Sequence, residues 1–326
     1  MPTVHHHAVA STLLQAGLDL LVEKPLAASL AEADDLIALA EKHGRILQVG
    51  HLERFNPAVL AVQPQLRRPM FFEAHRLSIF TPRALDVDVV LDLMIHDLDI
   101  VLTFAASPVR EVRAVGLPIL SPKVDIANVR VEFESGCVAN FTASRVSTER
   151  VRKLRFFEPR QYVSIDYARR DVLVIGIDDA PASASAPVAP ELAQAAQQFL
   201  ATGKLDSTVI QQLLSGGKIP GALLGQIMAA QSDPAALRKL AEGLAQPAAP
   251  EGLAPGLSFA KPAVTPGEPL KLELESFLES VRTRRAPRVT ARQGRAALEL
   301  ALTIQARMEA HAQRAGLGNF FTAGAQ

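Results

Sequence analysis

The sequence predicts an α/β protein in which a short parallel sheet is followed by an α+β domain with a large, mainly antiparallel open sheet. Over the first 50 residues, buried-type apolar runs alternate with amphipathic segments, which is typical of a parallel sheet covered on both faces. Beyond about residue 56, strand-like segments follow one another with one early helix, which indicates an α+β domain. An apolar fraction of 48% over 326 residues is enough for such a core.

Composition and charge narrow the classes of partner. Lys+Arg and Asp+Glu both total 34, so no overall positive field attracts a nucleic acid or an anionic membrane. No apolar run reaches the roughly 20 residues of a membrane helix, and no signal-peptide pattern opens the chain. Cys137 is the only cysteine, which excludes an intramolecular disulfide and suits a reducing compartment. We therefore expect a soluble cytoplasmic protein with a small-molecule partner.

Two helix–strand pairs are expected at the N-terminus, over residues 5–17, 18–23, 29–44 and 45–50. Gly17 and Gly44 stand where glycine commonly ends a helix. Ser29 and Glu32 have the spacing of a capping box, which places a helix start at Ser29. The short apolar runs between the helices have the length and composition of buried strands.

The remaining elements follow from alternation and amphipathic spacing. We expect a strand, a helix, a run of strands and two C-terminal helices over residues 70–80, 89–104, 109–175, 270–285 and 292–313. Ser135 and Gly136 mark a hairpin within the strand run, because residues alternate on both sides of them.

The predicted domain organisation has four parts. These are a helix–strand layer, an α+β domain, an Ala/Pro-rich helical insertion with flexible linkers, and C-terminal helices that pack back on both domains, over residues 1–55, 56–177, 178–266 and 267–326. The insertion is expected to hold short helices at residues 192–202, 207–216 and 234–245.

The helix expected near residue 90 carries acidic and histidine side chains in an otherwise apolar segment. Asp92, His96 and Asp99 follow i, i+4, i+7, so at about 100° per residue they form one narrow stripe, with Asp88 at its N-terminal end. One interpretation is a solvent-facing edge with a satisfied core histidine. The other is catalysis, because a carboxylate can orient an imidazole that titrates near neutral pH.

A second candidate position is Lys24, directly after the first predicted strand. Open parallel sheets bind ligands at the carboxyl ends of their strands, and Pro25 keeps Lys24 out of helical dihedrals. Its ammonium could bind a hydroxyl or stabilise a developing alkoxide. The alternative is an ordinary solvated loop lysine.

Taken together, these motifs resemble the Gfo/Idh/MocA family of NAD(P)-dependent oxidoreductases. The matching segments are PTVHHHAVA from Pro2, VEKPLA from Val22, GHLERFNPAV from Gly50, LDLMIHDLDIVL from Leu91, and the C-terminal EPLKLELESFL and RVTARQGRAALELALTI. The combination of the EKP motif with D-x-x-x-H is more specific than either motif alone. The resemblance implies a Rossmann-type cofactor domain, of which residues 1–55 would be the C-terminal part, and a substrate and oligomerisation domain at residues 56–177. It also implies hydride transfer between NAD(P) and a sugar hydroxyl.

The resemblance also implies roles for individual residues. Lys24 would bind or polarise the reacting hydroxyl, His96 would act as general base, and Asp92 would orient His96 or the sugar. Asp99 has no implied role and is expected to be a helix-surface or core-network carboxylate. The residues expected beside the cofactor are Thr3, His6, Glu23 and Pro25, and those on the substrate side are Arg54 and Asn56.

Within the family, the sequences that begin at Gly50 and Leu91 are similar to those of a branch that oxidises the 3-hydroxyl of UDP-N-acetylglucosamine in lipid A precursor synthesis. An inositol or simple-sugar dehydrogenase, or a non-catalytic ligand-binding relative, stays open as an alternative. Arginines that could pair with a diphosphate, or else be solvated or at a dimer interface, are Arg145, Arg152, Arg155 and Arg160.

The sequence departs from the family pattern at its start. No G-x-G-x-x-G motif occurs in the chain, and Met1 to Thr3 already correspond to a point beyond that motif. We therefore expect an N-terminally truncated protein with an incomplete parallel sheet, an exposed sheet edge and weak cofactor binding. The expected cofactor is NAD(P), with NAD preferred over NADP.

Metal binding is not expected. The consecutive histidines His5, His6 and His7 would point about 100° apart on a helix and would not converge on one ion. The resemblance implies a homo-dimer or homo-tetramer formed through the open face of the large sheet, since helices cover only its other side.

Overall fold

The computed structural model describes residues 1–81, 87–177 and 257–317 and the single positions 196, 198, 200, 238 and 241. It divides into two compact units, Met1–Val172 with Ala263–Gln326, and Leu173–Pro262. Apart from those single positions, the helices expected within 178–266 lie outside the described residues. The predicted domain boundaries therefore stay predictions. Within the described ranges, no helix combines the length and apolar character needed to cross a membrane.

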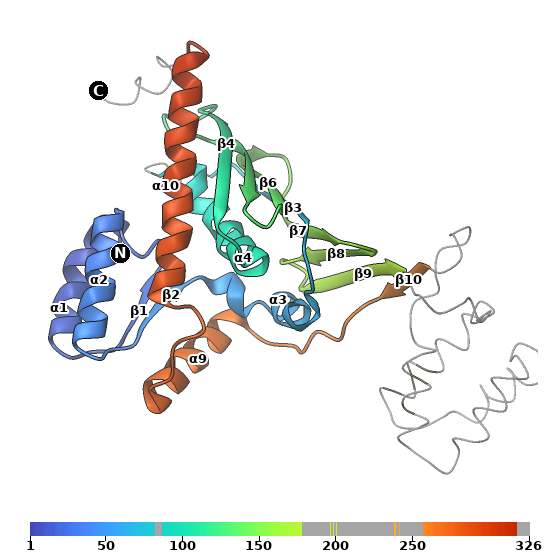
Figure 1. Cartoon of the computed structure of the whole chain (residues 1–326), viewed down its shortest axis with the longest axis horizontal. Helices are drawn as coiled ribbons and strands as arrows, with labels where there is room; N and C mark the ends of the chain where they lie inside the picture. The colour runs from blue at the N-terminus through green and yellow to red at the C-terminus, as the bar shows by residue number, and fades with distance from the viewer. Residues whose placement is uncertain are drawn as a thin grey trace, which may run out of the picture. The chain divides into compact units, whose positions relative to one another are not determined.

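The N-terminal layer of the first unit is the expected helix–strand repeat (Figure 1). Its elements are η1 (Thr3–His5), α1 (His6–Gln15), β1 (Leu20–Glu23), α2 (Leu30–Lys42) and β2 (Leu47–Gly50). The strands β1 and β2 pair in parallel. Gly17 and Gly44 have φ values of 85° and 60° directly after the two helices, and the capping box of Ser29 with Glu32 is present. The predicted helix ends and the helix start are thus confirmed.

The rest of the first unit contains a larger sheet and its helices. Its elements are η2 (Leu52–Phe55), α3 (Pro57–Val62), η3 (Gln63–Gln65), β3 (Phe71–Ile79), η4 (Val90–Met94), α4 (Ile95–Ala105), β4 (Val109–Leu117), β5 (Ile126–Phe133), β6 (Val138–Ser147), β7 (Val151–Glu158), β8 (Gln161–Asp166), α9 (Pro269–Thr283) and α10 (Ala291–Arg314). Its strands run in the order β8-β7-β3-β6-β5-β4. All neighbours are antiparallel except β3 and β6, which are parallel. The mainly antiparallel sheet is therefore confirmed.

The described part of the second unit is a strand pair. β9 (Asp171–Ile177), which begins within the first unit, pairs antiparallel with β10 (Leu257–Ala260). In the first unit, the hairpin between β5 and β6 turns at Gly136, which has a φ of 83°, as its position between alternating segments predicts.

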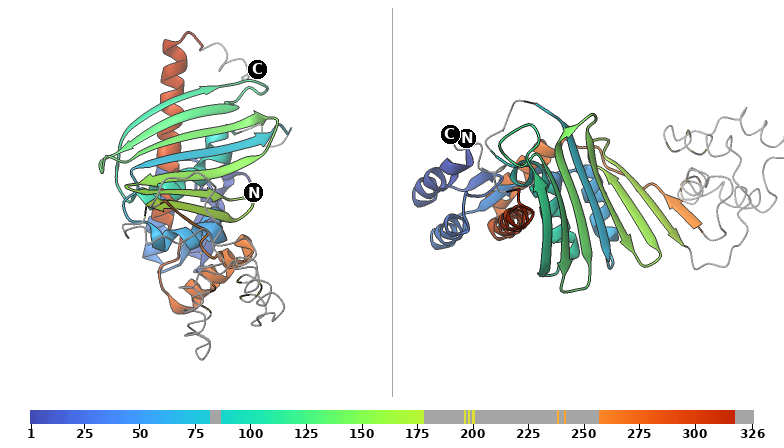
Figure 2. Two further views of the ribbon diagram at one scale, coloured as in Figure 1. Left: turned by 90° about the vertical axis from the view of Figure 1, so that its right-hand side faces the viewer. Right: turned by 90° about the horizontal axis from the view of Figure 1, so that it is seen from above.

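One face of the large sheet is apolar and buried. Phe72, Phe141 and Phe156 belong to this face, and each is at most 1% exposed. Figure 2 shows α10 on that side of the strands, and α10 packs against β4 and against α4. The opposite face carries polar, more exposed side chains such as Asn128 and Arg130. Oligomerisation through that face stays a prediction.

Helix α10 connects the N-terminal layer with the large sheet, because it packs on α2 and β2 as well as on β4 and α4. Its approach to β2 requires a glycine. A Cβ atom at Gly294 would lie 2.5 Å from Cγ2 of Val49, closer than side chains come in folded proteins. The main-chain N–H of Val49 also donates to the carbonyl of Val289, at 3.2 Å, just before the helix begins.

Candidate active site

The turn after β1 places Lys24 where the sequence predicts it. β1 ends at Glu23, and the peptide bond between Lys24 and Pro25 is cis. Nζ of Lys24 donates hydrogen bonds to the main-chain carbonyl oxygens of Asp92, at 2.7 Å, and Leu91, at 3.4 Å. Burial lowers the pKa of the Lys24 ammonium, and the Asp92 carboxylate opposes that shift. Lys24 is therefore a partly buried cation held against the candidate catalytic helix, and not a solvated loop residue.

That helix opens with a π-helical turn, η4, and continues as α4. The N–H of Ile95 donates to the carbonyl of Val90, five residues back. The expected constant spacing of 100° per residue is therefore wrong between Asp92 and His96, because a π-turn inserts an extra residue. No described hydrogen bond joins these two side chains, so the orienting role of Asp92 stays a prediction.

Asp88 lies before this turn and caps it. Its Oδ1 accepts hydrogen bonds from the N–H groups of Val90, at 2.9 Å, and Leu91, at 3.0 Å. The side chain of Gln305, on α10, donates to its Oδ2. Asp88 is thus a helix cap and not the end of a catalytic stripe.

His96 lies within the electrostatic reach of Lys24. Burial lowers the pKa of His96 well below its usual value, and the positive charges of Lys24 and Arg76 lower it further. Further contributions come from His51 and from Arg152 on β7. Nδ1 of His96 is buried without a hydrogen-bond partner in the described part of the chain. The result is a neutral imidazole on the helix to which the Lys24 ammonium is hydrogen-bonded, an arrangement that can accept a proton from a hydroxyl that the lysine polarises.

A buried ion pair fixes the other side of this helix. The guanidinium of Arg76, on β3, binds both carboxylate oxygens of Asp97, with N–O distances of 2.7 and 3.0 Å. It also donates to Glu53 at 3.1 Å and lies 5.2 Å from the centre of the Tyr167 ring. Such bidentate geometry is among the strongest polar contacts in proteins. It joins β3, η2 and α4 directly beside His96.

A second buried polar group lies at the end of β2. His51 follows Gly50 and is 1% exposed, and neither of its ring nitrogens has a hydrogen-bond partner among the described residues. Burial lowers the pKa of His51, while the carboxylate of Asp99 raises it. Asp99 is also buried, with its Oδ1 3.9 Å from Nη1 of Arg54. Asp99 is therefore part of an interior charged network and not of the helix surface.

The residues predicted on the cofactor side lie together around the EKP turn. Nδ1 of the buried His6 lies 2.9 Å from the carbonyl oxygen of Pro25. Thr3 begins the 3-10 turn that leads into this histidine. Glu23 is exposed. The geometry thus brings Thr3, His6, Glu23 and Pro25 to one place, and their contact with a cofactor stays a prediction.

The residues predicted on the substrate side have contacts within the protein. Asn56 caps α3, since its Oδ1 accepts from the N–H of Ala58 at 3.1 Å. Its amide nitrogen donates to Glu53 at 3.1 Å and to the Tyr167 carbonyl at 3.0 Å. Arg54 donates to the carbonyl of Arg288 at 3.3 Å. Both side chains are buried, and their contact with a substrate stays a prediction.

Of the arginines considered for a diphosphate, Arg145 lies in the interior. Its guanidinium donates to the Val87 carbonyl at 2.6 Å and lies 3.6 Å from Asp125. Arg155 is 3.7 Å from Glu73 on the neighbouring strand. Arg152 is exposed and acts on His96, so it is the one placed toward the candidate site. Arg160, at φ 66°, lies in the turn between β7 and β8.

Several functional candidates were missed from the sequence. Arg76 follows Phe72 and Ala74 at i+2 on the buried face of β3, and that alternation could have indicated a buried arginine. His51 directly follows β2, at the same sheet edge as Lys24, which is where ligands bind. Glu273, on α9, is 1% exposed, and no local signal separates it from the exposed acids of the same helix. Burial raises its pKa to about 7, and the neighbouring Glu23 adds to the shift.

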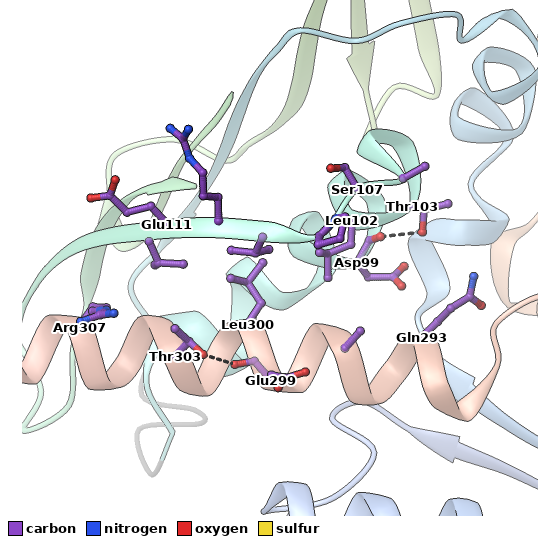
Figure 3. A pocket seen from close by; sticks show the side chains of 16 residues that line it. Asp99, Leu102, Thr103, Ser107, Glu111, Gln293, Glu299, Leu300, Thr303 and Arg307 are labelled. Carbon is purple, nitrogen blue, oxygen red and sulfur yellow. Dashed lines mark hydrogen bonds between the residues drawn. The ribbon is translucent and has the colours of Figure 1, made fainter. Parts of the chain in front are cut away.

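A cavity of about 670 Å³ is bounded by α4, β4 and α10. Asp99 and Thr103 form part of its α4 side, and Gln293 and Leu300 part of its α10 side (Figure 3). Asp99 therefore reaches both this cavity and the interior network at His51. The described residues contain no group of three or more His, Cys, Asp or Glu side chains arranged to hold a metal ion.

Family models match the N-terminal layer of the first unit and most of its large-sheet part. The model described as "Oxidoreductase family, NAD-binding Rossmann fold" matches residues 1–51. The model of the GFO/IDH/MocA C-terminal domain matches residues 58–160.

Curated relatives match about half of the chain. It is 42% identical over 167 residues to UDP-N-acetylglucosamine 3-dehydrogenase of Acidithiobacillus ferrooxidans, a match that covers 51% of this chain and 53% of that protein. It is 27% identical over 161 residues to scyllo-inositol 2-dehydrogenase (NAD(+)) of Bacillus subtilis, covering 45% and 47%. The chain thus spans about half the length of the curated relatives it matches.

Solved structures agree with these matches. A structure of the A. ferrooxidans dehydrogenase is similar with a TM-score of 0.70 and 28% identity, covering 95% of this chain and 77% of that one. An aldose-aldose oxidoreductase of Caulobacter crescentus shares the fold, with a TM-score of 0.63 at 18% identity. With the EKP turn and the D-x-x-x-H helix in place, these findings place residues 1–51 and 58–160 in the Gfo/Idh/MocA oxidoreductase family.

Proposed function

We propose that this protein is an oxidoreductase that moves a hydride between NAD(P), with NAD preferred, and the 3-hydroxyl of UDP-N-acetylglucosamine. The observation that carries the proposal is the attachment of Lys24, through hydrogen bonds to the carbonyl oxygens of Leu91 and Asp92, to the helix that also carries the neutral imidazole of His96. Oxidation of a secondary alcohol requires a group that polarises the hydroxyl and a group that accepts its proton. The relationship to a UDP-N-acetylglucosamine 3-dehydrogenase supports the choice of substrate.

The residues around the EKP turn fit the nicotinamide end of such a cofactor. The carboxyl ends of the parallel strands β1 and β2 meet there, and ligands of open α/β sheets bind at this edge. Glu23 is exposed at that edge, and His6 is fixed against Pro25. When bound, the cofactor would accept the hydride. Thr3, His6, Glu23 and Pro25 are the residues that we propose to hold it.

In this proposal, Lys24 binds the substrate oxygen and His96 takes the hydroxyl proton. The Asp92 carbonyl holds Lys24 in place through the 2.7 Å hydrogen bond. Because His96 is neutral at physiological pH, it is ready to act as a base without first losing a proton.

Reduction of NAD by the protein, with UDP-N-acetylglucosamine as substrate, tests the proposal. Turnover should fall by about two orders of magnitude or more in His96→Ala and Lys24→Ala. The matched control is His5→Ala, which changes an exposed histidine of η1.

The relationship to inositol dehydrogenases motivates a second candidate, oxidation of a free polyol. Parallel assays with UDP-sugars and with free inositols separate the two. Turnover of polyols alone would contradict the nucleotide-sugar assignment. A protein with no nicotinamide-dependent turnover on either class would favour a non-catalytic ligand-binding role.

A further inference from the structure

One guanidinium beside the proposed site has no partner within the described part of the chain. Arg152, on β7, is exposed, and no described residue holds its side chain through a hydrogen bond or an ion pair. Its backbone is fixed, because its carbonyl accepts a hydrogen bond from the N–H of Tyr167 at 3.0 Å. An arginine with a fixed backbone and a free guanidinium is suited to bind a carboxylate or a phosphate from outside the protein.

Arg152 belongs to the face of the large sheet that the helices cover. Side chains alternate between the two faces of a strand, and Leu154 and Phe156, at i+2 and i+4 from Arg152, are at most 1% exposed. Arg152 shares their face of β7 but is exposed. The covered face therefore opens to solvent at this end of β7, and Arg152 lies at the opening.

Two contacts show how helix α4 lies relative to β7. Near the C-terminal end of α4, the ring of Phe104 packs edge-on against Phe156, with 6.1 Å between the ring centres. Near its N-terminal end, Asp97 is bound by Arg76 of β3 through N–O distances of 2.7 and 3.0 Å. The helix therefore runs along β3 and β7, and its N-terminal end lies at the level of Arg76.

Arg152 is the direct cross-strand partner of Arg76 in the antiparallel pairing of β3 with β7. Such partners lie on the same face of a sheet, with Cβ atoms about 4.5–5.5 Å apart. Arg76 is hydrogen-bonded to Asp97, which is the residue that follows His96. Arg152 therefore lies beside the end of α4 that carries the proposed base. In agreement with this placement, the positive charge of Arg152 contributes to lowering the pKa of His96.

Other arginines near the site are already engaged within the protein. The guanidinium of Arg76 is bound by two carboxylates. Arg54 is buried and donates to a main-chain carbonyl. Arg155 belongs to the opposite face of the sheet, where it lies 3.7 Å from a glutamate. Of these four arginines, Arg152 is the one whose charge is left for a ligand.

We propose that Arg152 binds the diphosphate of the nucleotide sugar and so selects nucleotide sugars over free sugars and polyols. The inference rests on the proposed function and names a binding residue for its substrate. In a nucleotide sugar the diphosphate is attached to C1, with one ring carbon between C1 and the reacting C3. A phosphate-binding group must therefore lie beside the catalytic base without taking part in the chemistry, and Arg152 has that position.

The chemistry of the guanidinium accounts for the selection. Its planar fork of N–H donors matches the oxygens of a phosphate and neutralises part of their charge. A free polyol offers uncharged hydroxyl groups, so it gains much less from the same contact. Because the diphosphate does not change during oxidation at C3, Arg152 would bind it equally in the ground state and in the transition state. Loss of such a contact raises KM and leaves kcat unchanged.

The first experiment measures the binding of UDP to this chain by calorimetry, without cofactor. Arg152→Met should weaken UDP binding by about ten- to a hundredfold, the loss expected for one hydrogen bond between charged groups. Arg152→Lys should recover part of the affinity, because it keeps the charge but not the fork. Uridine, which has no phosphate, should bind equally to the unmodified chain and to Arg152→Met.

Lys153→Met is the matched control, because it removes a cation from the opposite face of the same strand. It should leave UDP binding unchanged. A histidine NMR titration of the same variants checks the placement of Arg152. The pKa of His96 should rise in Arg152→Met, because a nearby positive charge is lost, and should stay unchanged in Lys153→Met.

The second experiment measures turnover of the cofactor-loaded enzyme. Arg152→Met should raise KM for UDP-N-acetylglucosamine by about ten- to a hundredfold with kcat nearly unchanged. Failure of the unmodified chain to bind UDP, equal UDP affinity in Arg152→Met, or equal KM in an active enzyme would overturn the role of Arg152 while leaving the oxidoreductase activity standing. Absence of turnover in the unmodified enzyme would count against the proposed function, and the UDP titration would still decide whether Arg152 binds the diphosphate.

Discussion

Nζ of Lys24 lies 2.7 Å from the main-chain carbonyl oxygen of Asp92, so the turn after β1 is joined to the helix that carries His96. The partner is the backbone of Asp92, and the carboxylate acts on the ammonium only through its charge. The position of the lysine therefore depends on the course of the π-helical turn at Val90–Met94, which exposes carbonyl groups that a regular α-helix would use internally.

Lys24→Met should separate the charge of this lysine from its packing. The methionine fills similar space without the ammonium, so turnover should fall by about two to three orders of magnitude. The pKa of His96 should rise, because a positive charge that lowers it is gone. A histidine NMR titration measures this shift in the chain without cofactor. Lys24→Arg keeps the charge and is the control, and an unchanged His96 pKa in Lys24→Met would contradict the electrostatic contact.

The stability of the protein should fall at acidic pH because of His96 and His51. The pKa values of both lie below the usual 6.5 in the folded state, so the unfolded chain binds more protons as the pH drops below about 6.5. Urea unfolding at several pH values should show a decreasing free energy of unfolding in that range. His96→Gln should flatten the decrease, whereas His5→Gln, at an exposed site, should not.

Removing only one partner of the ion pair between Arg76 and Asp97 should lower the free energy of unfolding substantially. Arg76→Met leaves the Asp97 carboxylate buried without its partner, and we expect a loss of about 3–5 kcal/mol in the free energy of unfolding. The double variant Arg76→Met/Asp97→Leu should recover much of that loss. Arg113→Met removes an exposed pair with Glu111 and should leave stability nearly unchanged. Equal losses in the single and double variants would show that the charge imbalance is not the cause.

Glu273 should make the free energy of unfolding depend on pH in the opposite direction to His96 and His51. Its pKa is raised from 4.5 to about 7 in the folded state, so the folded protein binds more protons than the unfolded chain between these values. Its contribution to the free energy of unfolding should therefore fall as the pH rises from 4.5 to about 7. Glu273→Gln should remove this contribution and stabilise the protein at pH 8. Glu275→Gln, on the exposed side of the same helix, is the matched control.

Local chemistry was sufficient to predict most elements of the first unit. The capping box at Ser29 and the glycines at 17, 44 and 136 depend on a few neighbouring residues, and the structure places them as expected. The parallel pairing of β3 with β6 was not predicted, because it depends on contacts between residues about 70 positions apart in sequence. Such contacts leave no periodic signal.

Only part of the candidate site was predicted, because the rest depends on contacts between distant parts of the chain. Lys24 and His96 belong to recognisable motifs, and they lie within electrostatic reach of each other. The π-turn depends on how the helix meets Lys24 and α10, so a helical-wheel argument misplaced Asp88 and Asp92 relative to His96. Asp99 was expected to be a surface or core-network carboxylate, and the structure places it in the buried network.

The contact between Gly294 and Val49 has a consequence for protein synthesis. β2 leaves the ribosome long before α10, and at about 5–20 residues per second the interval is roughly 10–50 seconds. During that time the side of β2 that later packs against Gly294 has no cover, so the nascent N-terminal layer exposes apolar surface. Chaperone binding to ribosome-bound chains should therefore persist until residues 291–314 have emerged.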